Sequence, residues 1–344
     1  MNRLLGLIQV LNEWKGLNYS WKICYIEPVK SREYLLGKQW RFVMQSILIT
    51  GGTVFVSKYV AEYFVKQGNQ VYVLNRNSRK QPAGATLIQA DRHSLGDVLK
   101  GKTFDAIIDV SAYTAEDVTH LLDSGVSFRE YVFISSSAVY PETASQPFLE
   151  EGTLGENKFW GSYGTNKIAA EQVLQEKVPH AYILRPPYLY GPYNNVYREA
   201  FVFDCAMADR KFYLPKDGEM KLQFFHVADL CRFIEVILKQ KPNQHIFNVG
   251  NEQPVSIREW VWLCYAAAGK QAEWVPVYKE PEQRAYFPFY EYEYALDVTR
   301  QKQLMPATIP LKEGLEEAFR WYEQHMDEVN KRPYLSYIDE KIAE

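Results

Sequence analysis

The stretch ILITGGTVFVSKYVAEYFVKQGNQVYVLNRN, residues 47–77, decides the fold class. It is typical of a buried strand, a glycine turn, a helix and a second strand. Gly51 and Gly52 allow the backbone to turn tightly and approach a pyrophosphate, and the following helix points its N-terminal amides at that charge. Two glycines alone also fit a simple strand–helix turn, but their place at the start of a βαβ unit predicts a dinucleotide site. In a GxxGxxG spacing the later glycines would fall at Val54 and Ser57, so we expect weaker binding or a slightly displaced cofactor.

Apolar, β-branched runs continue to alternate with helical patterns after this unit. Their length is that of buried parallel strands, and the alternation predicts a doubly wound α/β sheet, that is, a Rossmann fold. After Pro187 the pattern loosens into loops rich in Tyr, Pro and Asn, and we expect a smaller C-terminal part that completes a cleft over the carboxyl edge of the sheet. The predicted strands lie at 46–50, 70–75, 85–91, 104–111, 130–137 and 180–187, and later helices are expected near 227–240, 256–268 and 311–326.

The predicted organisation has four parts. They are an N-terminal extension at 1–43, a dinucleotide-binding domain at 44–190, a mostly substrate-binding part at 191–330 with some segments returning to the Rossmann core, and a tail at 331–344. The extension has an apolar stretch but no small-residue cleavage site, so we do not interpret it as a signal peptide. It is either a real extension or translated sequence upstream of a natural start at Met44. We favour the second, because the recognisable fold begins at Gln45.

Composition argues against several classes of partner. The 344-residue chain has a net charge of −3, which gives no global basic field for nucleic acid. Its four cysteines are scattered without a CxxC pair, which favours reduced thiols in a cytosolic protein, and the histidines show no metal-ligand spacing. No apolar run approaches the about 20 residues that a membrane span needs. We therefore expect a cytoplasmic protein with no metal, membrane or nucleic-acid partner.

The end of the second predicted strand bears on the choice of cofactor. A fold that prefers NAD usually places a carboxylate there for the ribose 2′-hydroxyl, whereas this chain has Asn75-Arg76-Asn77. A guanidinium can pair with a 2′-phosphate, so we favour NADP over NAD, although Arg76 stacked on the adenine would serve either cofactor. Asp91 is placed for the adenine amine, or it caps a turn. The cofactor residues predicted here are Gly51, Gly52, Thr53, Phe55, Val56, Asn75, Arg76, Asp91 and Arg92.

Tyr163 and Lys167 stand at positions i and i+4 of SYGTNKIAAE, residues 162–171, and would share one helical face. An ammonium near a phenol favours the phenolate and lowers the tyrosine pKa from about 10 toward the working range. The tyrosine can then take or give the proton of a hydroxyl while a nicotinamide takes or gives the hydride. The serines of FISSSAVY, residues 133–140, end a predicted strand at the cleft edge, where a hydroxyl would orient the substrate oxygen. Together these parts predict a Ser–Tyr–Lys catalytic site.

Five motifs in this order resemble the extended short-chain dehydrogenase/reductase family, and more narrowly its NAD(P)-dependent epimerase/dehydratase branch. The resemblance covers about Gln45 to Trp321. It implies that Tyr163 is the acid/base, Lys167 its electrostatic partner and Ser136 the hydroxyl donor, with Ser137 as the fallback. It also implies that Pro186 and Pro187 lie near the nicotinamide and that Ser111, Ala112 and Tyr113 line the underside of the cofactor. The motifs are TGG at 50–52, SSSAVY at 135–140, YGTNK at 163–167, LRPPYLYGP at 184–192 and FHVADL at 225–230.

The substrate is less well specified by the resemblance. Sugar-nucleotide members of the family usually carry an arginine four residues before the histidine of the HV-x-D motif, and here that position is Leu222. An apolar residue there speaks against nucleotide-sugar recognition, although Arg284 could supply a phosphate clamp from a later loop. Polar and aromatic loop residues suit a carbohydrate-like ligand, or they simply cover the core. The predicted substrate-binding residues are Ser137, Tyr188, Asn194, Arg198 and Arg284.

We therefore expect an NAD(P)-dependent epimerase or dehydratase that acts on a sugar or sugar nucleotide. We place epimerase first, because a dehydratase generally needs further acid/base groups, and nothing in the sequence places Glu142, Glu150 or Glu151 at the substrate. The alternative is a non-catalytic NAD(P)-binding scaffold or an RNA-binding protein, since divergent relatives with TGGT openings include chloroplast stem-loop RNA-binding proteins. Relatives often dimerise through a four-helix interface that would include the Tyr163 helix, so a homodimer is also expected.

Overall fold

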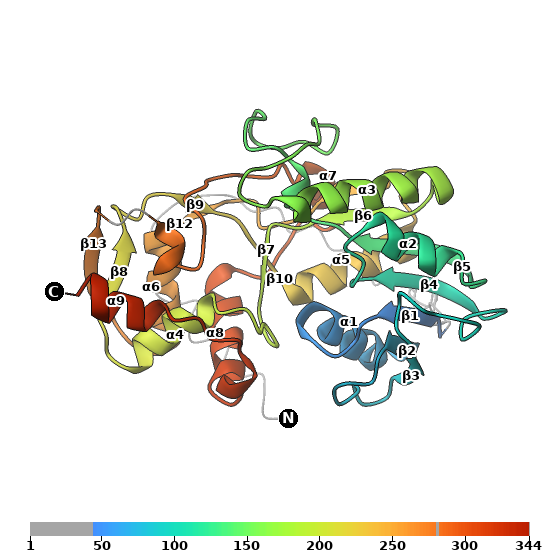
Figure 1. Cartoon of the computed structure of the whole chain (residues 1–344), viewed down its shortest axis with the longest axis horizontal. Helices are drawn as coiled ribbons and strands as arrows, with labels where there is room; N and C mark the ends of the chain where they lie inside the picture. Colours follow the sequence, from blue (N-terminus) through green and yellow to red (C-terminus); the bar gives the residue numbers. More distant parts are fainter. Residues whose placement is uncertain (1–43, 280–281, 344) are drawn as a thin grey trace, which may run out of the picture. The chain divides into compact units, whose positions relative to one another are not determined.

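Parallel strands form a central sheet of seven strands in the described part of the chain (Figure 1). The computed structural model describes residues 44–279 and 282–343, and the predictions on residues 1–43 lie outside the described residues. The sheet order is β11-β6-β5-β4-β1-β2-β3, with every neighbouring pair parallel. The order reverses between β1 and β4, and such a switch point is where ligands bind in open α/β sheets. The strands are β1 (Ser46–Thr50), β2 (Gln70–Asn75), β3 (Thr86–Gln89), β4 (Thr103–Asp109), β5 (Ser127–Ile134), β6 (Tyr182–Arg185) and β11 (Ile246–Asn248).

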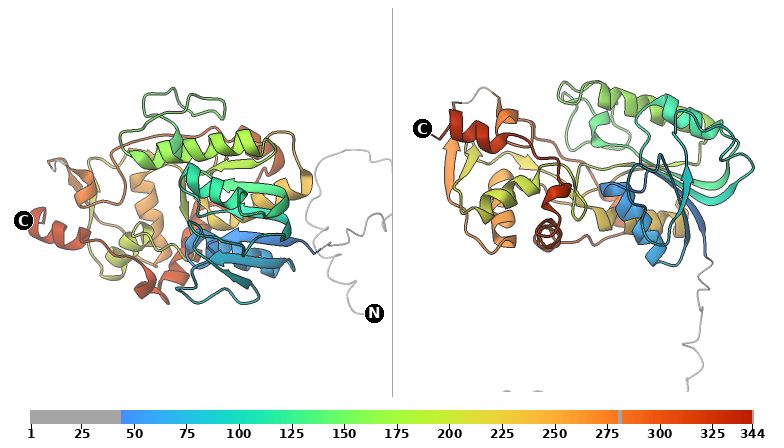
Figure 2. Two further views of the ribbon diagram at one scale, coloured as in Figure 1. Left: turned by 45° about the vertical axis from the view of Figure 1, so that its right-hand side comes forward. Right: turned by 60° about the horizontal axis from the view of Figure 1, so that its bottom comes forward.

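Helices cover both faces of this sheet (Figures 1 and 2). Because both faces are covered, the central strands are continuous apolar runs without alternation, and Ile47, Leu48 and Ile49 of β1 are all fully buried. The two helices on one face are α1 (Phe55–Lys66) and α5 (Val227–Gln240), and the two on the other are α2 (Ala115–Leu122) and α3 (Ser162–Lys177).

The C-terminal part has its own core, which is mostly aromatic. Trp260 is fully buried and stacks on Phe224, with Phe287 and Phe289 against its edges. Three two-stranded sheets surround this core, namely β7 (Tyr188–Tyr190) with β10 (Phe224–His226), β8 (Phe212–Pro215) with β13 (Trp274–Val277), and β9 (Lys221–Leu222) with β12 (Val255–Ser256). The helices are α4 (Glu199–Met207), α6 (Ile257–Ala267), α7 (Thr299–Leu304), α8 (Leu311–Tyr322) and α9 (Tyr334–Lys341), with 3-10 turns η1 (Ser137–Val139), η2 (Gln283–Ala285) and η3 (Met326–Glu328).

The predicted fold class is confirmed, and the differences are local. The residues of β1 and β2 are those expected, and α5, α6 and α8 lie within or close to the predicted ranges. The expectation of loops directly after Pro187 was wrong, because Tyr188–Tyr190 forms a short strand that pairs with Phe224–His226. The strand predicted at 130–137 was placed about three residues too far along the chain, because β5 ends at Ile134 and the serines follow it.

Two further features concern possible partners. Among the described helices, every one is too short or too polar to cross a bilayer. Within residues 44–279 and 282–343, no group of three or more His, Cys, Asp or Glu side chains is arranged to hold a metal ion.

Candidate active site

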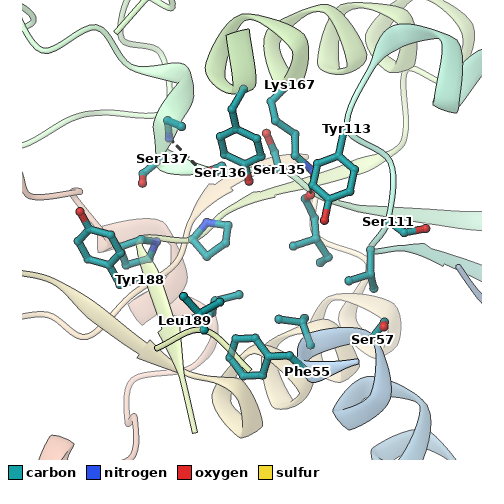
Figure 3. Close-up of a pocket in the computed structure, with 18 of the residues that line it drawn as sticks. Phe55, Ser57, Ser111, Tyr113, Ser135, Ser136, Ser137, Lys167, Tyr188 and Leu189 are labelled. Atoms are coloured by element: carbon teal, nitrogen blue, oxygen red, sulfur yellow. Dashed lines mark hydrogen bonds between the residues drawn. The ribbon is translucent and has the colours of Figure 1, made fainter. Parts of the chain in front are cut away.

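A cavity of about 850 Å³ opens at the carboxyl edge of the sheet, next to the switch point. One wall is the glycine turn and the start of α1, and the other is the serine segment after β5 together with α3. Figure 3 shows Phe55 and Ser57 across the cavity from Lys167 and the three serines. The predicted site residues that line it are Gly51, Thr53, Phe55, Val56, Arg76, Ser111, Tyr113, Ser136, Ser137, Tyr163, Lys167, Pro186, Tyr188 and Arg198.

The glycine turn has a backbone that only glycine adopts easily. Gly51 and Gly52 have φ of +90° and +93°, and a Cβ on Gly52 would lie 2.5 Å from Cγ1 of Val73 in the neighbouring strand. The helix that follows has no side-chain cap at Val54 and no acidic residue in its first turn. Its first amides and the positive end of its dipole are therefore suited to an anion in the cavity. Ser57 stands at the expected third glycine, and its hydroxyl donates to the Val54 carbonyl at 2.9 Å.

Some predicted cofactor residues lie behind the cavity wall rather than in it. The Asn75 amide donates to the Gly51 carbonyl at 2.7 Å and so holds the glycine turn in place. The Arg92 guanidinium is used inside the protein, where it pairs with Asp109 and Asp117. Gly52 packs beneath the turn. These residues shape the wall of the cavity, and a direct contact with the cofactor stays a prediction for each of them.

Three other predicted residues also have partners within the fold. Asp91 accepts a hydrogen bond from the backbone N–H of His93 in a turn after β3, in line with the capping alternative. The Asn194 amide is buried and donates to the Glu199 carboxylate at 2.8 Å. Arg284 lines a smaller pocket beside the cavity. None of the three lines the main cavity.

Asp109 is a buried carboxylate that the sequence interpretation missed. It accepts hydrogen bonds from the Thr50 hydroxyl at 2.6 Å and from the Tyr131 hydroxyl at 2.7 Å. Although burial alone would raise its pKa, the Arg92 guanidinium and these hydrogen bonds hold the pKa below its usual range. The Thr50 hydroxyl in turn accepts from the backbone N–H of Ser111 at 3.0 Å. Asp109 therefore ties the ends of β1 and β4 together at the switch point.

Lys167 is almost fully buried below the cavity. Its Nζ donates to the carbonyl oxygens of Ala112 at 2.7 Å and Ile134 at 2.8 Å, and it lies 5.0 Å from the centre of the Tyr113 ring. Burial lowers the pKa of this amine to about 8. Lys167 therefore points inward from α3, and Ala112 contributes its carbonyl to the lysine.

Tyr163 is 38% exposed and lines the cavity next to the serine segment. Burial of its hydroxyl raises the pKa, and a hydrogen bond with Ser136 opposes this effect. The expectation of a lowered tyrosine pKa was wrong for this structure, because burial of the phenol outweighs the hydrogen bond with Ser136. The phenol is therefore protonated at neutral pH and is set up to give a proton.

The serine segment is held from both sides. Ser136 begins the turn η1 and its hydroxyl accepts from the Ala138 backbone N–H at 3.1 Å. The Ser137 hydroxyl lies 2.9 Å from the Tyr294 hydroxyl, which comes from the C-terminal part. Both serine hydroxyls line the cavity, with Ser136 bonded to Tyr163. The choice of Ser136 over Ser137 as the hydroxyl donor stays a prediction.

A buried ion pair fixes α3 against the sheet, and sequence reasoning did not identify it. The Glu171 carboxylate, one turn after Lys167, binds the Arg185 guanidinium with contacts of 2.6 and 3.0 Å. Glu171 also accepts from the Ser135 hydroxyl, and Arg185 donates to the Tyr140 hydroxyl at 2.8 Å. This network connects α3 to the serine segment and to the end of β6.

No carboxylate lines the cavity among the described residues. Glu142 accepts from the Lys158 backbone N–H, Glu150 accepts from the Asn248 backbone N–H, and Glu151 pairs with an arginine outside the cavity. The three acids that follow the serine segment are therefore placed away from it. The wall carries hydroxyl groups and cations instead.

Lys167 is expected to titrate near pH 8. Its folded pKa is lowered, so the amine is cationic below that pH and neutral above it. Nitrogen-detected NMR on lysine-labelled protein measures this directly, with Lys167→Met used to assign the signal. A Lys167 signal that titrates at about 10.4, as in free lysine, would contradict the burial seen here.

A model of the NAD dependent epimerase/dehydratase family matches residues 47–250 of the chain. The match includes the glycine turn, the serine segment, Tyr163, Lys167 and Pro186. It extends through β11, the last strand of the central sheet.

The chain is similar in sequence to a curated relative and in fold to solved structures. The chain is 27% identical over 302 residues to the chloroplast stem-loop binding protein of 41 kDa b of Arabidopsis thaliana, which covers 80% of this chain and 78% of the relative. The fold of the present chain is similar to that of UDP-glucose 4-epimerase with UDP-glucose from Thermotoga maritima. The TM-score is 0.65 and the identity is 18%, and the match covers 82% of this chain and 99% of the other. It is also similar to dTDP-glucose 4,6-dehydratase in complex with NAD from Bacillus anthracis, at a TM-score of 0.66, 19% identity, and coverage of 83% and 98%.

Proposed function

Because the chain belongs to the NAD dependent epimerase/dehydratase family, we propose that it transfers a proton and a hydride at a carbinol carbon of a carbohydrate-like substrate. The catalytic residues are Ser136, Tyr163 and Lys167. The observation that carries this proposal is their convergence on one cavity whose other wall is the glycine turn and the uncapped start of α1. A phenol, a hydroxyl and an ammonium are thus placed beside a site for a pyrophosphate.

The residues of the cavity fit a nicotinamide dinucleotide. A Cβ on Gly51 would lie 2.9 Å from the hydroxyl oxygen of Ser57 on the cavity wall, so glycine keeps this part of the wall open, and no acid opposes the phosphates along the wall formed by described residues. The turn and α1 would hold the pyrophosphate, Arg76 the adenosine end, and Ser111, Tyr113 and Pro186 the nicotinamide end. When bound, the nicotinamide supplies hydride transfer.

The chain's own residues would handle the proton. Tyr163 is protonated at neutral pH, so its hydroxyl gives a proton to a carbonyl oxygen, and the Ser136 hydroxyl orients that oxygen. Lys167, cationic below about pH 8, stabilises the phenolate that remains. In the opposite direction the phenolate takes the proton of a hydroxyl. The absence of carboxylates from the described cavity wall favours an epimerase or a reductase over a dehydratase, which needs further acid/base groups.

Arg76→Gln tests the proposed preference for NADP. Arg76 is exposed at the end of β2 and lines the cavity, so it can pair with a 2′-phosphate that NAD lacks. The NADP affinity should fall about five- to tenfold, while the NAD affinity should stay within twofold. Isothermal titration calorimetry with both dinucleotides measures this. Arg79→Gln, in the same exposed loop but outside the cavity, is the matched control. Equal losses for NAD and NADP would instead support stacking on the adenine.

The match to a stem-loop binding protein supports a second candidate, an RNA-binding protein or NAD(P)-binding scaffold without turnover. The two functions respond differently to Tyr163→Phe. RNA binding would be indifferent to this change and would weaken steeply as salt is raised. The enzyme would lose turnover and keep cofactor binding. A homodimer and a cytoplasmic location stay predictions.

A further inference from the structure

The segment at residues 191–198, which follows β7, forms part of the wall of the main cavity. Its residues Asn195 and Val196 line the cavity, as does the start of α1 next to the glycine turn. Figure 3 shows Leu189 of β7 and Phe55 of α1 at the same end of the cavity. The segment comes from the C-terminal part and α1 from the central sheet, so this end of the cavity is built from both parts of the chain.

Tyr193 fastens the segment to α1. Its hydroxyl donates to the Glu62 carboxylate at 2.7 Å, and the Lys58 ammonium lies 4.0 Å from the centre of its ring. Glu62 and Lys58 are one turn apart on α1, so they share a face of that helix. The Tyr193 ring also contacts the rings of Tyr59 and Trp321, at centre distances of 6.1 and 5.7 Å. We call Tyr193, Glu62 and Lys58 the Tyr193 clamp.

The charge of Glu62 keeps the hydrogen bond of the clamp in one direction. Burial and the Glu62 carboxylate both raise the pKa of the Tyr193 phenol, so the hydroxyl stays protonated and donates. A hydrogen bond to an ionised acceptor is stronger than one between neutral groups. The clamp is therefore a specific polar contact and not only a contact between rings.

The backbone of Tyr193 is independent evidence for a function of this contact. Its φ of +68° is in the left-handed region, which an aromatic residue seldom adopts. Such a conformation persists only where the surrounding contacts fix it, and residues of this kind gather at ligand clamps and switch regions. Here the left-handed turn directs the ring toward α1.

The three clamp residues do not line the main cavity themselves. They join two parts of its wall from behind, so their effect on a bound molecule is indirect. When α1 and the segment move apart, the hydrogen bond to Glu62 and the contact with Lys58 are broken. Opening of this end of the cavity is therefore slowed by the clamp.

We propose that Tyr193 is a positioning residue that holds the segment 191–198 against α1 and thereby slows the release of a bound nicotinamide dinucleotide. The inference rests on the proposed function for the identity of the ligand. The pyrophosphate is held at the start of α1, and release requires α1 and the segment to separate. The clamp thus sets the residence time of the cofactor without touching it.

Stopped-flow displacement of NADPH from the full chain, followed by nicotinamide fluorescence, tests this proposal. Tyr193→Phe removes only the hydroxyl and should make NADPH dissociation about tenfold faster, because a hydrogen bond to a charged group is lost. Glu62→Ala should have the same effect. The double variant should be no faster than either single variant, because the two groups form one interaction. The association rate should stay within about twofold, since effects of this kind act mainly on dissociation.

A second variant separates the ring from the backbone. Tyr193→Asn removes the whole ring, while asparagine tolerates the left-handed backbone. Dissociation should then be about a hundredfold faster, because the contact with Lys58 is lost together with the hydrogen bond. Tyr278→Phe is the matched control, since Tyr278 is an exposed tyrosine outside the cavity, and its NADPH dissociation should equal that of the wild type.

Two results would overturn the inference. One is an equal dissociation rate in the wild type, Tyr193→Phe and Tyr193→Asn. The other is an association rate that falls as much as the dissociation rate rises, which would mean that the variants only distort the fold. Tyr163→Phe separates this inference from the proposed function, because it should release NADPH at the wild-type rate. Loss of catalysis by Tyr163 would leave the clamp standing, whereas a wild-type protein that binds neither NADPH nor NADH would overturn both.

Discussion

Replacement of Tyr163 by phenylalanine is expected to lower turnover by a factor of about 10²–10⁴ and to leave the affinity for NAD(P) unchanged. The variant keeps the ring that lines the cavity and removes only the hydroxyl that bonds Ser136. Among the described residues, no carboxylate and no other phenol is hydrogen-bonded to Ser136 and could replace this proton donor. Tyr294, the phenol at the neighbouring serine, bonds the Ser137 hydroxyl instead. Steady-state kinetics with sugar and sugar-phosphate substrates, together with calorimetry of cofactor binding, measures both quantities.

The matched control for this prediction is Tyr278→Phe. Tyr278 is 67% exposed and lies outside the cavity, so its loss should change neither quantity. Turnover that survives in Tyr163→Phe would remove this residue from the chemistry. Loss of cofactor binding in the same variant would show that the phenol has a structural role instead.

Glu171→Ala should have the largest effect on stability. The substitution leaves the Arg185 guanidinium buried, at 1% exposure, without its carboxylate, and it removes the acceptor of the Ser135 hydroxyl. Breaking a buried pair in this way costs about 3–5 kcal/mol in the free energy of unfolding. Urea denaturation followed by tryptophan fluorescence measures this loss.

Glu176→Ala is the control for the same helix. Glu176 is exposed on α3, and its removal should change the free energy of unfolding by less than about 0.5 kcal/mol. If the free energy of unfolding of Glu171→Ala equalled that of this control, the network between α3, the serine segment and β6 would make no net contribution to stability.

The parts of the fold that the sequence predicts are those with local patterns. β1 and β2 are continuous apolar runs, and the turn between β1 and α1 needs glycine, so Ser46–Asn75 could be assigned almost residue by residue. The strands β7 and β11 have only three residues each. So short a run carries no periodicity, and its pairing depends on contacts with segments far along the chain.

The same distinction applies to the site. Tyr163 and Lys167 share a helix, so their spacing places both, but the direction of the tyrosine pKa shift depends on how deeply the fold buries the phenol. The hydrogen bonds of the Lys167 amine also depend on the fold. Its acceptors are the backbone carbonyls of Ala112 and Ile134, and because every residue type has such a carbonyl, the sequence does not reveal them. The partners of Asp109 and Arg185 are likewise set by the fold. Arg198, Arg284 and Arg332 meet in one pocket only because three segments far apart in sequence converge.

A crystal structure of the protein with NADP tests the central claim most directly. We expect the pyrophosphate at the glycine turn and the start of α1, and the nicotinamide ring in the cavity beside the Tyr163 hydroxyl. A dinucleotide that binds with its nicotinamide away from Tyr163, or a cavity that stays empty at saturating NADP, would contradict the account.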